Sequence, residues 1–85
     1  MIYNAKVKYT YFSEECKIGF TIQGNKDFET VYFSPALIKD ILNVLEVRSW
    51  EDLKRKFARI DVSYDNLVIR VGNIIEDKWV SLCLL

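Results

Sequence analysis

The chain of 85 residues contains no histidine and only two cysteines, so the side chains that usually perform catalysis near neutral pH are scarce. Without histidine there is no Ser-His or Cys-His nucleophile, and the commonest protein ligand of zinc is missing. Neighbouring acidic residues occur at positions 14–15, 51–52 and 76–77. They fall in expected turns or at an expected helix start, whereas catalytic carboxylates need a cleft that separates their pKa values. We therefore expect a protein that is not an enzyme and that uses no metal or cofactor.

Lysines and aromatic rings share one face of the first three expected strands. This outer face comprises Lys6, Lys8, Lys17, Phe28 and Tyr32. Cations that hold phosphates beside rings that stack on bases are typical of sheets that bind single-stranded nucleic acid. The alternative is a solvated sheet face whose lysines discourage aggregation, and the sequence leaves both interpretations open.

A second group of cations lies in the C-terminal half of the chain. It comprises Lys54, Arg55, Lys56, Arg59, Arg70 and Lys78. The cations of positions 54–59 follow a short expected helix, where they would complement its dipole. Arg70 is expected to pair with Asp61 across a hairpin. The alternative is an anion site for a phosphate or a nucleotide signal, formed by Arg59, Arg70, Lys54, Arg55 and Lys78.

Hydrophobic residues make up 51% of the chain, which is high for a domain whose small size limits the surface it can bury. Residues 79–85 are apolar on both faces of an expected strand, so this strand is either central or part of an interface. We expect apolar surface to be shared with a protein partner or with a second copy of the chain. The expected interface comprises Trp50, Trp79, Leu82, Leu84 and Leu85.

The overall charge and the distribution of apolar residues exclude two other classes of protein. Twelve basic and twelve acidic residues cancel, unlike the basic excess of a protein that binds duplex DNA. No apolar run approaches the roughly 20 residues that a membrane span needs. Two separated cysteines without a disulfide pattern suit a reducing cytoplasm.

The periodicity of the chain predicts one domain, residues 1–85, of the α+β class. Alternating segments predict strands at 5–11, 16–22 and 28–33, a hairpin over 58–75, and a last strand at 79–85. Ser34 and Pro35 begin an expected helix over 34–47, and a second helix is expected over 48–57. The predicted order is βββ-αα-βββ: an antiparallel sheet, twisted or partly closed, with the two helices packed on one face.

The alternation also predicts how the strands are paired. Tyr9 is expected opposite Ile18 on the inner face of the sheet. In the second hairpin, Tyr64 and Leu67 are expected to face each other on the inner side. A bulge at Gly72-Asn73 is expected to keep the asparagine out of the apolar layer and to return the next residue to the core.

Two segments of the C-terminal half, "SWEDLKRKFARIDV" (49–62) and "VGNIIEDKWV" (71–80), resemble a family of small, mostly uncharacterised proteins from phages and prophages of Gram-positive bacteria. The residues that fit are Trp50, Glu51, Asp52, Leu53, Lys54, Lys56, Arg59, Gly72, Ile74, Ile75, Glu76, Asp77, Lys78 and Trp79. Arg55 stands where glycine is usual, and Asn73 where histidine is usual. The resemblance implies a mobile-element origin, the cytoplasm of a bacterial host, and a class of proteins in which inhibitors of host defence systems are common.

These observations lead to one principal hypothesis and two alternatives. The principal hypothesis is a non-enzymatic phage-type module that binds a protein or itself. The first alternative is a module that binds single-stranded nucleic acid through the lysine and aromatic face. The second is a module that binds an anionic small molecule.

Overall fold

The computed structural model describes residues 1–24, 26–30 and 32–82. The strands are β1 (Ile2–Phe12), β2 (Cys16–Ile22), β3 (Lys26–Thr30), β4 (Phe57–Val62), β5 (Leu67–Gly72) and β6 (Trp79–Ser81). The helical segments are the 3-10 turn η1 (Pro35–Leu37), the α-helix α1 (Ile38–Leu45) and the 3-10 turn η2 (Glu51–Leu53). No helix within these described ranges is long and apolar enough to cross a membrane.

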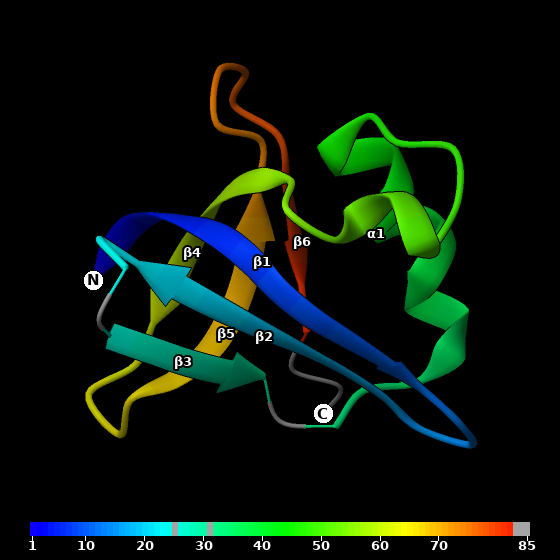
Figure 1. Ribbon diagram of the computed structural model, residues 1–85, viewed down its shortest axis with the longest axis horizontal. Coiled ribbons are helices and arrows are strands. Elements are labelled where there is room, and N and C mark those ends of the chain that lie inside the picture. Colours follow the sequence, from blue (N-terminus) through cyan, green and yellow to red (C-terminus); the bar gives the residue numbers. More distant parts are fainter. Residues whose placement is uncertain (25, 31, 83–85) are drawn as a thin grey trace.

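Five of the strands close into a barrel (Figure 1). The order is β3-β2-β1-β4-β5, and β5 returns to β3 through the parallel pairs Glu29–Leu67 and Thr30–Val68. β6 pairs with the other half of β5. A five-stranded Greek-key barrel with a helix between its third and fourth strands has the topology of the OB-fold, although topology alone assigns no function. The prediction of an α+β fold with two helices packed on one face of a sheet is therefore wrong.

The long first strand makes closure possible because it pairs with two neighbours. Its first half pairs with β4 and its second half with β2. The β1–β2 register shifts between Val7 and Tyr9, so Lys8 is an extra residue that bends the strand. Beyond this bulge Tyr9 lies on the outer face, where its ring covers Gly19. The predicted inward position of Tyr9 is therefore wrong.

One α-helix forms where two were expected. Ser34 accepts a hydrogen bond from the amide of Ala36 at 3.2 Å, as the predicted cap requires. Ile41 and Leu45 are buried, and α1 covers one end of the barrel (Figure 1). The expected second helix is only the turn η2, because the chain enters the left-handed region at Arg55 (φ 71°) and is extended afterwards.

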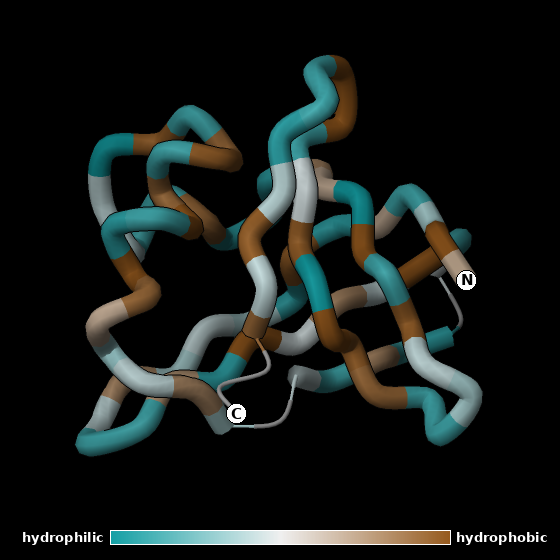
Figure 2. Tube along the Cα trace, turned by 180° about the vertical axis from the view of Figure 1, so that it is seen from behind, coloured by the Kyte–Doolittle hydropathy of each residue, from teal (hydrophilic) through white to brown (hydrophobic). Residues whose placement is uncertain are grey.

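The core fills the barrel with side chains from the inward positions of all six strands and from the helical segments. Its largest fully buried members are Phe20, Phe33, Ile18, Ile41, Leu45, Leu53 and Ile60. Figure 2 shows the alternation of hydrophobic and hydrophilic residues along the strands that produces this interior. Buried Thr30 accepts a hydrogen bond from the amide of Ile18 at 3.0 Å, so its hydroxyl is not left unsatisfied inside.

The β4–β5 hairpin follows the predicted register only at its open end. Asp61 lies opposite Arg70, as predicted, but the register then shifts so that Val62 pairs with Val68. Tyr64 is 96% exposed in the connecting loop. Its predicted place on the inner face is wrong because the turn is longer than the sequence suggested.

Candidate binding surface

Two basic segments that are far apart in the sequence meet beside the bulge of β1. The amide of Arg55 donates to the carbonyl of Val7 at 2.9 Å, and the amide of Val7 donates to the carbonyl of Lys56 at 2.9 Å. These bonds continue the β1–β4 pairing beyond the Lys6–Phe57 pair. The helix whose dipole the cations were expected to complement is absent, so that explanation no longer applies.

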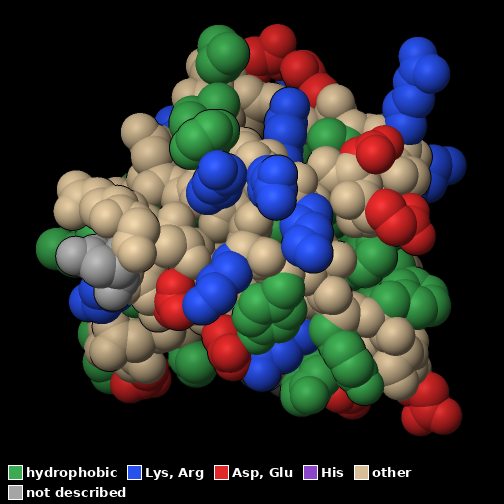
Figure 3. Space-filling model, in the orientation of Figure 1, with side chains coloured by type: hydrophobic (Ala, Val, Ile, Leu, Met, Phe, Trp, Pro, Cys, Tyr) green, Lys and Arg blue, Asp and Glu red, His purple; other side chains and the backbone are tan. Residues whose placement is uncertain are grey.

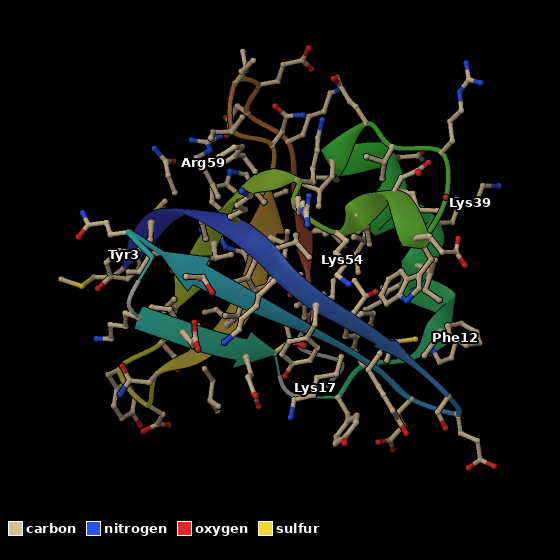
Figure 4. All side chains as sticks on the ribbon, in the orientation of Figure 1. Tyr3, Phe12, Lys17, Lys39, Lys54 and Arg59 are labelled. Atoms are coloured by element: carbon tan, nitrogen blue, oxygen red, sulfur yellow. The ribbon has the colours of Figure 1, made fainter. Side chains whose placement is uncertain are left out.

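The result is a surface that we call the basic face. It comprises Lys6, Lys54, Arg55, Lys56 and Phe57. Figure 3 shows lysine and arginine side chains gathered over β1 and over the segment that leads into β4, and Figure 4 labels Lys54 among them. Among the described residues, none of these four cations lies within 4.0 Å of a carboxylate. Their positive charge is therefore available to an external anion.

An aromatic ring and a shallow pocket belong to the same surface. Phe57 is 55% exposed, and the ammonium of Lys6 lies 5.5 Å from the centre of its ring. The adjoining pocket has a volume of about 270 Å³ and is lined by Asn4, Ala5, Lys6, Thr21, Gln23, Gly24 and Phe57. Phe57 is not among the binding residues predicted from the sequence. The alternation of apolar Ala58, Ile60 and Val62 with outward residues could have revealed it as the outward start of a strand.

The neighbouring surface, which we call the paired face, is formed by residues of β1, β2 and β3 and holds the same residue types in closed pairs. Lys8 and Asp27 lie 2.6 Å apart, and so do Lys17 and Glu29. The hydroxyl of Tyr9 donates to Glu29 at 2.7 Å. Hydrogen bonds from lysine hold the pKa values of both carboxyl groups below their usual range. Burial and the bond to Glu29 raise the pKa of Tyr9.

The residues predicted to bind nucleic acid are thus divided among three environments. Lys6 belongs to the basic face, whereas Lys8 and Lys17 belong to the paired face. Phe28 is only 4% exposed and packs in the core, so its predicted outward position is wrong. Tyr32 is 51% exposed and lies beside the ammonium of Lys17, which is 5.3 Å from the centre of its ring.

Two of the residues predicted to bind an anion stack on a tryptophan instead. The guanidinium carbons of Arg59 and Arg70 lie 4.9 and 4.5 Å from the centre of a Trp79 ring. The ring covers Gly72, where a Cβ atom would lie 2.7 Å from it. Arg70 donates to Asp61 at 2.9 and 2.7 Å, which confirms the predicted pair and lowers the pKa of that carboxyl group.

Arg59 also fixes the loop of residues 73–78. Its Nε donates to the carbonyl of Asn73 at 2.7 Å, and its Nη2 donates to the carbonyl of Glu76 at 2.9 Å. Figure 4 labels Arg59 beside β4. Lys78 lies 2.9 Å from Glu76 and 3.6 Å from Glu46. These contacts leave Arg59, Arg70 and Lys78 engaged with the protein itself.

Asn73 lies inside the fold, so the predicted bulge is wrong. β5 ends at Gly72, and the Asn73 side chain is buried, where its Nδ2 donates to the carbonyl of Val44 at 2.8 Å. Its Oδ1 accepts hydrogen bonds from the amides of Ile75 and Glu76 at 2.8 and 3.0 Å. Every polar atom of this side chain that needs a partner therefore has one, which removes the cost of placing an amide in the core.

The residues predicted to form a protein interface are also distributed over several environments. Leu82 is 6% exposed and belongs to the core. Trp50 is half-buried, with its ring 6.2 Å from that of Phe33 and 6.4 Å from that of Phe12. Leu84 and Leu85 lie outside the described residues. The apolar surface near Trp50 thus comes partly from the exposed ring of Phe12, labelled in Figure 4.

The two segments that carry the phage-family resemblance form one structural unit. Arg59 of the first segment clamps the loop of the second and stacks on Trp79, which in turn covers Gly72. No family model, curated protein or solved structure matches the chain. The family resemblance therefore stays a prediction.

Proposed function

We propose that the protein is a non-enzymatic binding module that holds single-stranded nucleic acid on its basic face. The observation that carries this proposal is the pairing of Val7 with Arg55 and Lys56, which brings two basic segments side by side. A surface that presents cations without internal carboxylate partners attracts phosphates, and this attraction is independent of sequence.

The shape of the surface favours an extended anion over a small one. Its four cations follow a strand and the segment beside it rather than converging on a point. Arg59, Arg70 and Lys78, which could have formed a compact anion site, are engaged with carbonyl or carboxylate oxygens of the protein. A chain of phosphates fits the basic face better than a single nucleotide does.

The exposed ring favours a single strand over a duplex. Phe57 can stack on a base only if the face of that base is accessible, as it is in a single strand. The side-chain amides of Asn4 and Gln23 line the same pocket and offer hydrogen bonds to base edges.

The proposal is tested by measuring fluorescence anisotropy of labelled single-stranded oligonucleotides at increasing salt concentration. A single-strand contact contributes about −0.7 to the slope of log K against log salt concentration for each neutralised phosphate, so four cations predict a slope of about −2.8. Lys54→Ala should make the slope shallower by about 0.7. Binding that is absent at about 20 mM salt contradicts the proposal.

The matched control is Lys39→Ala, which removes one exposed lysine from α1, away from the basic face (Figure 4). It should leave both the affinity and the salt slope unchanged. If Lys39→Ala weakens binding as much as Lys54→Ala does, the attraction is a property of the whole surface and the proposed site is wrong.

A further inference from the structure

The loop of residues 73–78 projects from the barrel between β5 and β6 (Figure 1). One side of its tip is hydrophobic and the other is hydrophilic, as Figure 2 shows. Ile75 is 89% exposed and Ile74 is 37% exposed. Neither isoleucine belongs to the core cluster, so the fold gains little from apolar side chains at this position.

The loop is held in one conformation by its own hydrogen bonds. Besides the bonds from Arg59 and to the Asn73 side chain, the amide of Asn73 donates to the carbonyl of Lys78 at 2.9 Å, and the amide of Lys78 donates to the carbonyl of Glu76 at 2.9 Å. The indole of Trp79 donates to Asp77 at 3.1 Å. A segment that is already ordered loses little conformational entropy when it binds, so the tip is suited to recognition.

The charge around the tip is negative. Glu76 and Asp77 follow the isoleucines directly, and Glu46 lies beside the base of the loop through its contact with Lys78. Three carboxylates thus outnumber the two cations that contact this loop, which are the ammonium of Lys78 and the guanidinium of Arg59. A partner that binds this tip needs an apolar pocket with basic residues at its edge.

The chain itself carries such a pocket. Ala5 and the ring of Phe57 supply the apolar lining of the 270 Å³ pocket on the basic face, and Lys6 supplies its cation. We propose that the loop tip of one molecule docks into this pocket of a second copy, with Ile75 beside Phe57 and Glu76 beside Lys6. Within one molecule the contact is absent, because Ile75 is exposed.

The symmetry of the contact decides the size of the assembly. Two molecules that exchange tips form a closed pair, whereas a one-way contact adds molecules head to tail. A single tip buries far less than the roughly 800 Å² per partner of a standard interface. We therefore expect weak self-association that grows with concentration.

Sedimentation velocity of the full chain from about 20 µM to about 1 mM tests the inference in the range expected for a small interface. The weight-average sedimentation coefficient should rise with concentration for the wild type and stay constant for Ile75→Asp. Tyr64→Asp is the matched control, because Tyr64 is 96% exposed on a different loop. It should associate as the wild type does. A wild type that remains monomeric at the highest concentration, or an Ile75→Asp variant that still associates, overturns the inference.

A charge exchange tests the identity of the pocket. Lys6→Glu and Glu76→Lys should each abolish the rise in sedimentation coefficient, because each brings like charges together. The double variant restores an opposite pair in every contact and should associate again. If the double variant associates no better than the single variants, the tip does not dock at Lys6 and the pocket assignment is wrong. This test does not depend on whether nucleic acid binds.

Discussion

The basic face and the paired face are adjacent on the barrel and built from the same kinds of residue, yet they offer different chemistry. Both present strand lysines next to exposed or half-exposed rings. On the paired face Lys8 and Lys17 are each 2.6 Å from a carboxylate. On the basic face the ammonium of Lys6 lies 5.5 Å from the centre of the Phe57 ring, and no carboxylate of the described residues lies within 4.0 Å of it. The paired face satisfies its own charges, whereas the basic face leaves its charges available to a ligand.

The difference originates in the cross-strand neighbours. β3 places Asp27 and Glu29 opposite Thr21 and Gly19 of β2, within reach of lysines on the neighbouring positions. Lys6 has Thr21 on one side and Phe57 on the other, and neither is acidic. A lysine on a strand is therefore a binding residue or a structural one depending on the residue that pairing sets beside it.

The largest expected difference between the two faces concerns their aromatic rings. Phe57→Ala should weaken binding of a single-stranded oligonucleotide by about 5- to 150-fold, since a stacked base contributes about 1–3 kcal/mol. Because Phe57 is 55% exposed, thermal stability should change little. Tyr32→Ala removes a ring of similar exposure beside the paired face and should change affinity by less than about 2-fold. Equal losses in both variants, read by anisotropy, would show that the two faces are equivalent.

The next prediction converts the paired face into a basic one. Asp27→Asn combined with Glu29→Gln removes the carboxylates that neutralise Lys8 and Lys17 while keeping the shape of both side chains. The two freed cations should steepen the salt slope by about 1.4 units, at about 0.7 for each cation. Measurement of affinity across a salt series checks this. An unchanged slope would mean that Lys8 and Lys17 are out of reach of the bound strand.

A smaller effect on stability and on binding is expected at Arg55, where a strained backbone conformation carries a positively charged side chain. Arg55 has a φ of 71°, a conformation that costs a non-glycine residue about 1–2 kcal/mol. Arg55→Gly should raise the melting temperature by a few degrees, since about 1 kcal/mol shifts it by roughly 4–8 °C in a domain of this size. The same change should weaken oligonucleotide binding about 2- to 5-fold through the loss of one phosphate contact.

Glu46 supplies the control for this prediction. It has a φ of 58° at the end of α1, so Glu46→Gly relieves a similar strain away from the basic face. Differential scanning calorimetry should show a comparable gain in stability, while anisotropy shows no loss of affinity. If Arg55→Gly leaves affinity intact, Arg55 does not contribute to the proposed surface.

The sequence predicted those parts of the fold that depend on local patterns. The helix with its Ser34 cap, the inward alternation of β2 and the Asp61–Arg70 pair all follow from neighbours in the sequence or from one register. Closure of the barrel could not be predicted in this way. It depends on a bulge at Lys8 and on a parallel pairing between β3 and β5, strands that are separated in the sequence by α1 and β4.

The candidate surface was only half predictable for the same reason. Each basic segment was visible in the sequence, but the pairing of Val7 with Arg55 and Lys56, which brings the segments together, is a long-range contact. At Asn73, in contrast, a prediction made from the local sequence pattern was wrong. An amide in an apolar position suggested a bulge, whereas its hydrogen bonds to Val44, Ile75 and Glu76 allow it to stay inside.

The smallest expected effect is on how the stability of the fold depends on pH, through the two carboxyl groups of the paired face. The hydrogen bond from Lys8 makes the largest contribution to lowering the pKa of Asp27, and the hydrogen bond from Thr21 makes the next largest. Hydrogen bonds from Lys17 and Tyr9 lower the pKa of Glu29. A carboxyl group whose pKa is lower in the folded than in the unfolded chain stabilises the fold above its unfolded pKa, which is about 4 for these groups. This contribution is lost as the pH falls through the lower folded values.

Lys8→Ala separates the two carboxyl groups, because only Asp27 loses its strongest donor. NMR titration of the side-chain carboxyl carbons should show the pKa of Asp27 rising toward its ordinary value while that of Glu29 stays low. Lys17→Ala should have the reciprocal effect, with Asp27 unchanged. If either variant shifts both groups equally, the paired face titrates as one network, and its lysines could not be released one at a time for binding.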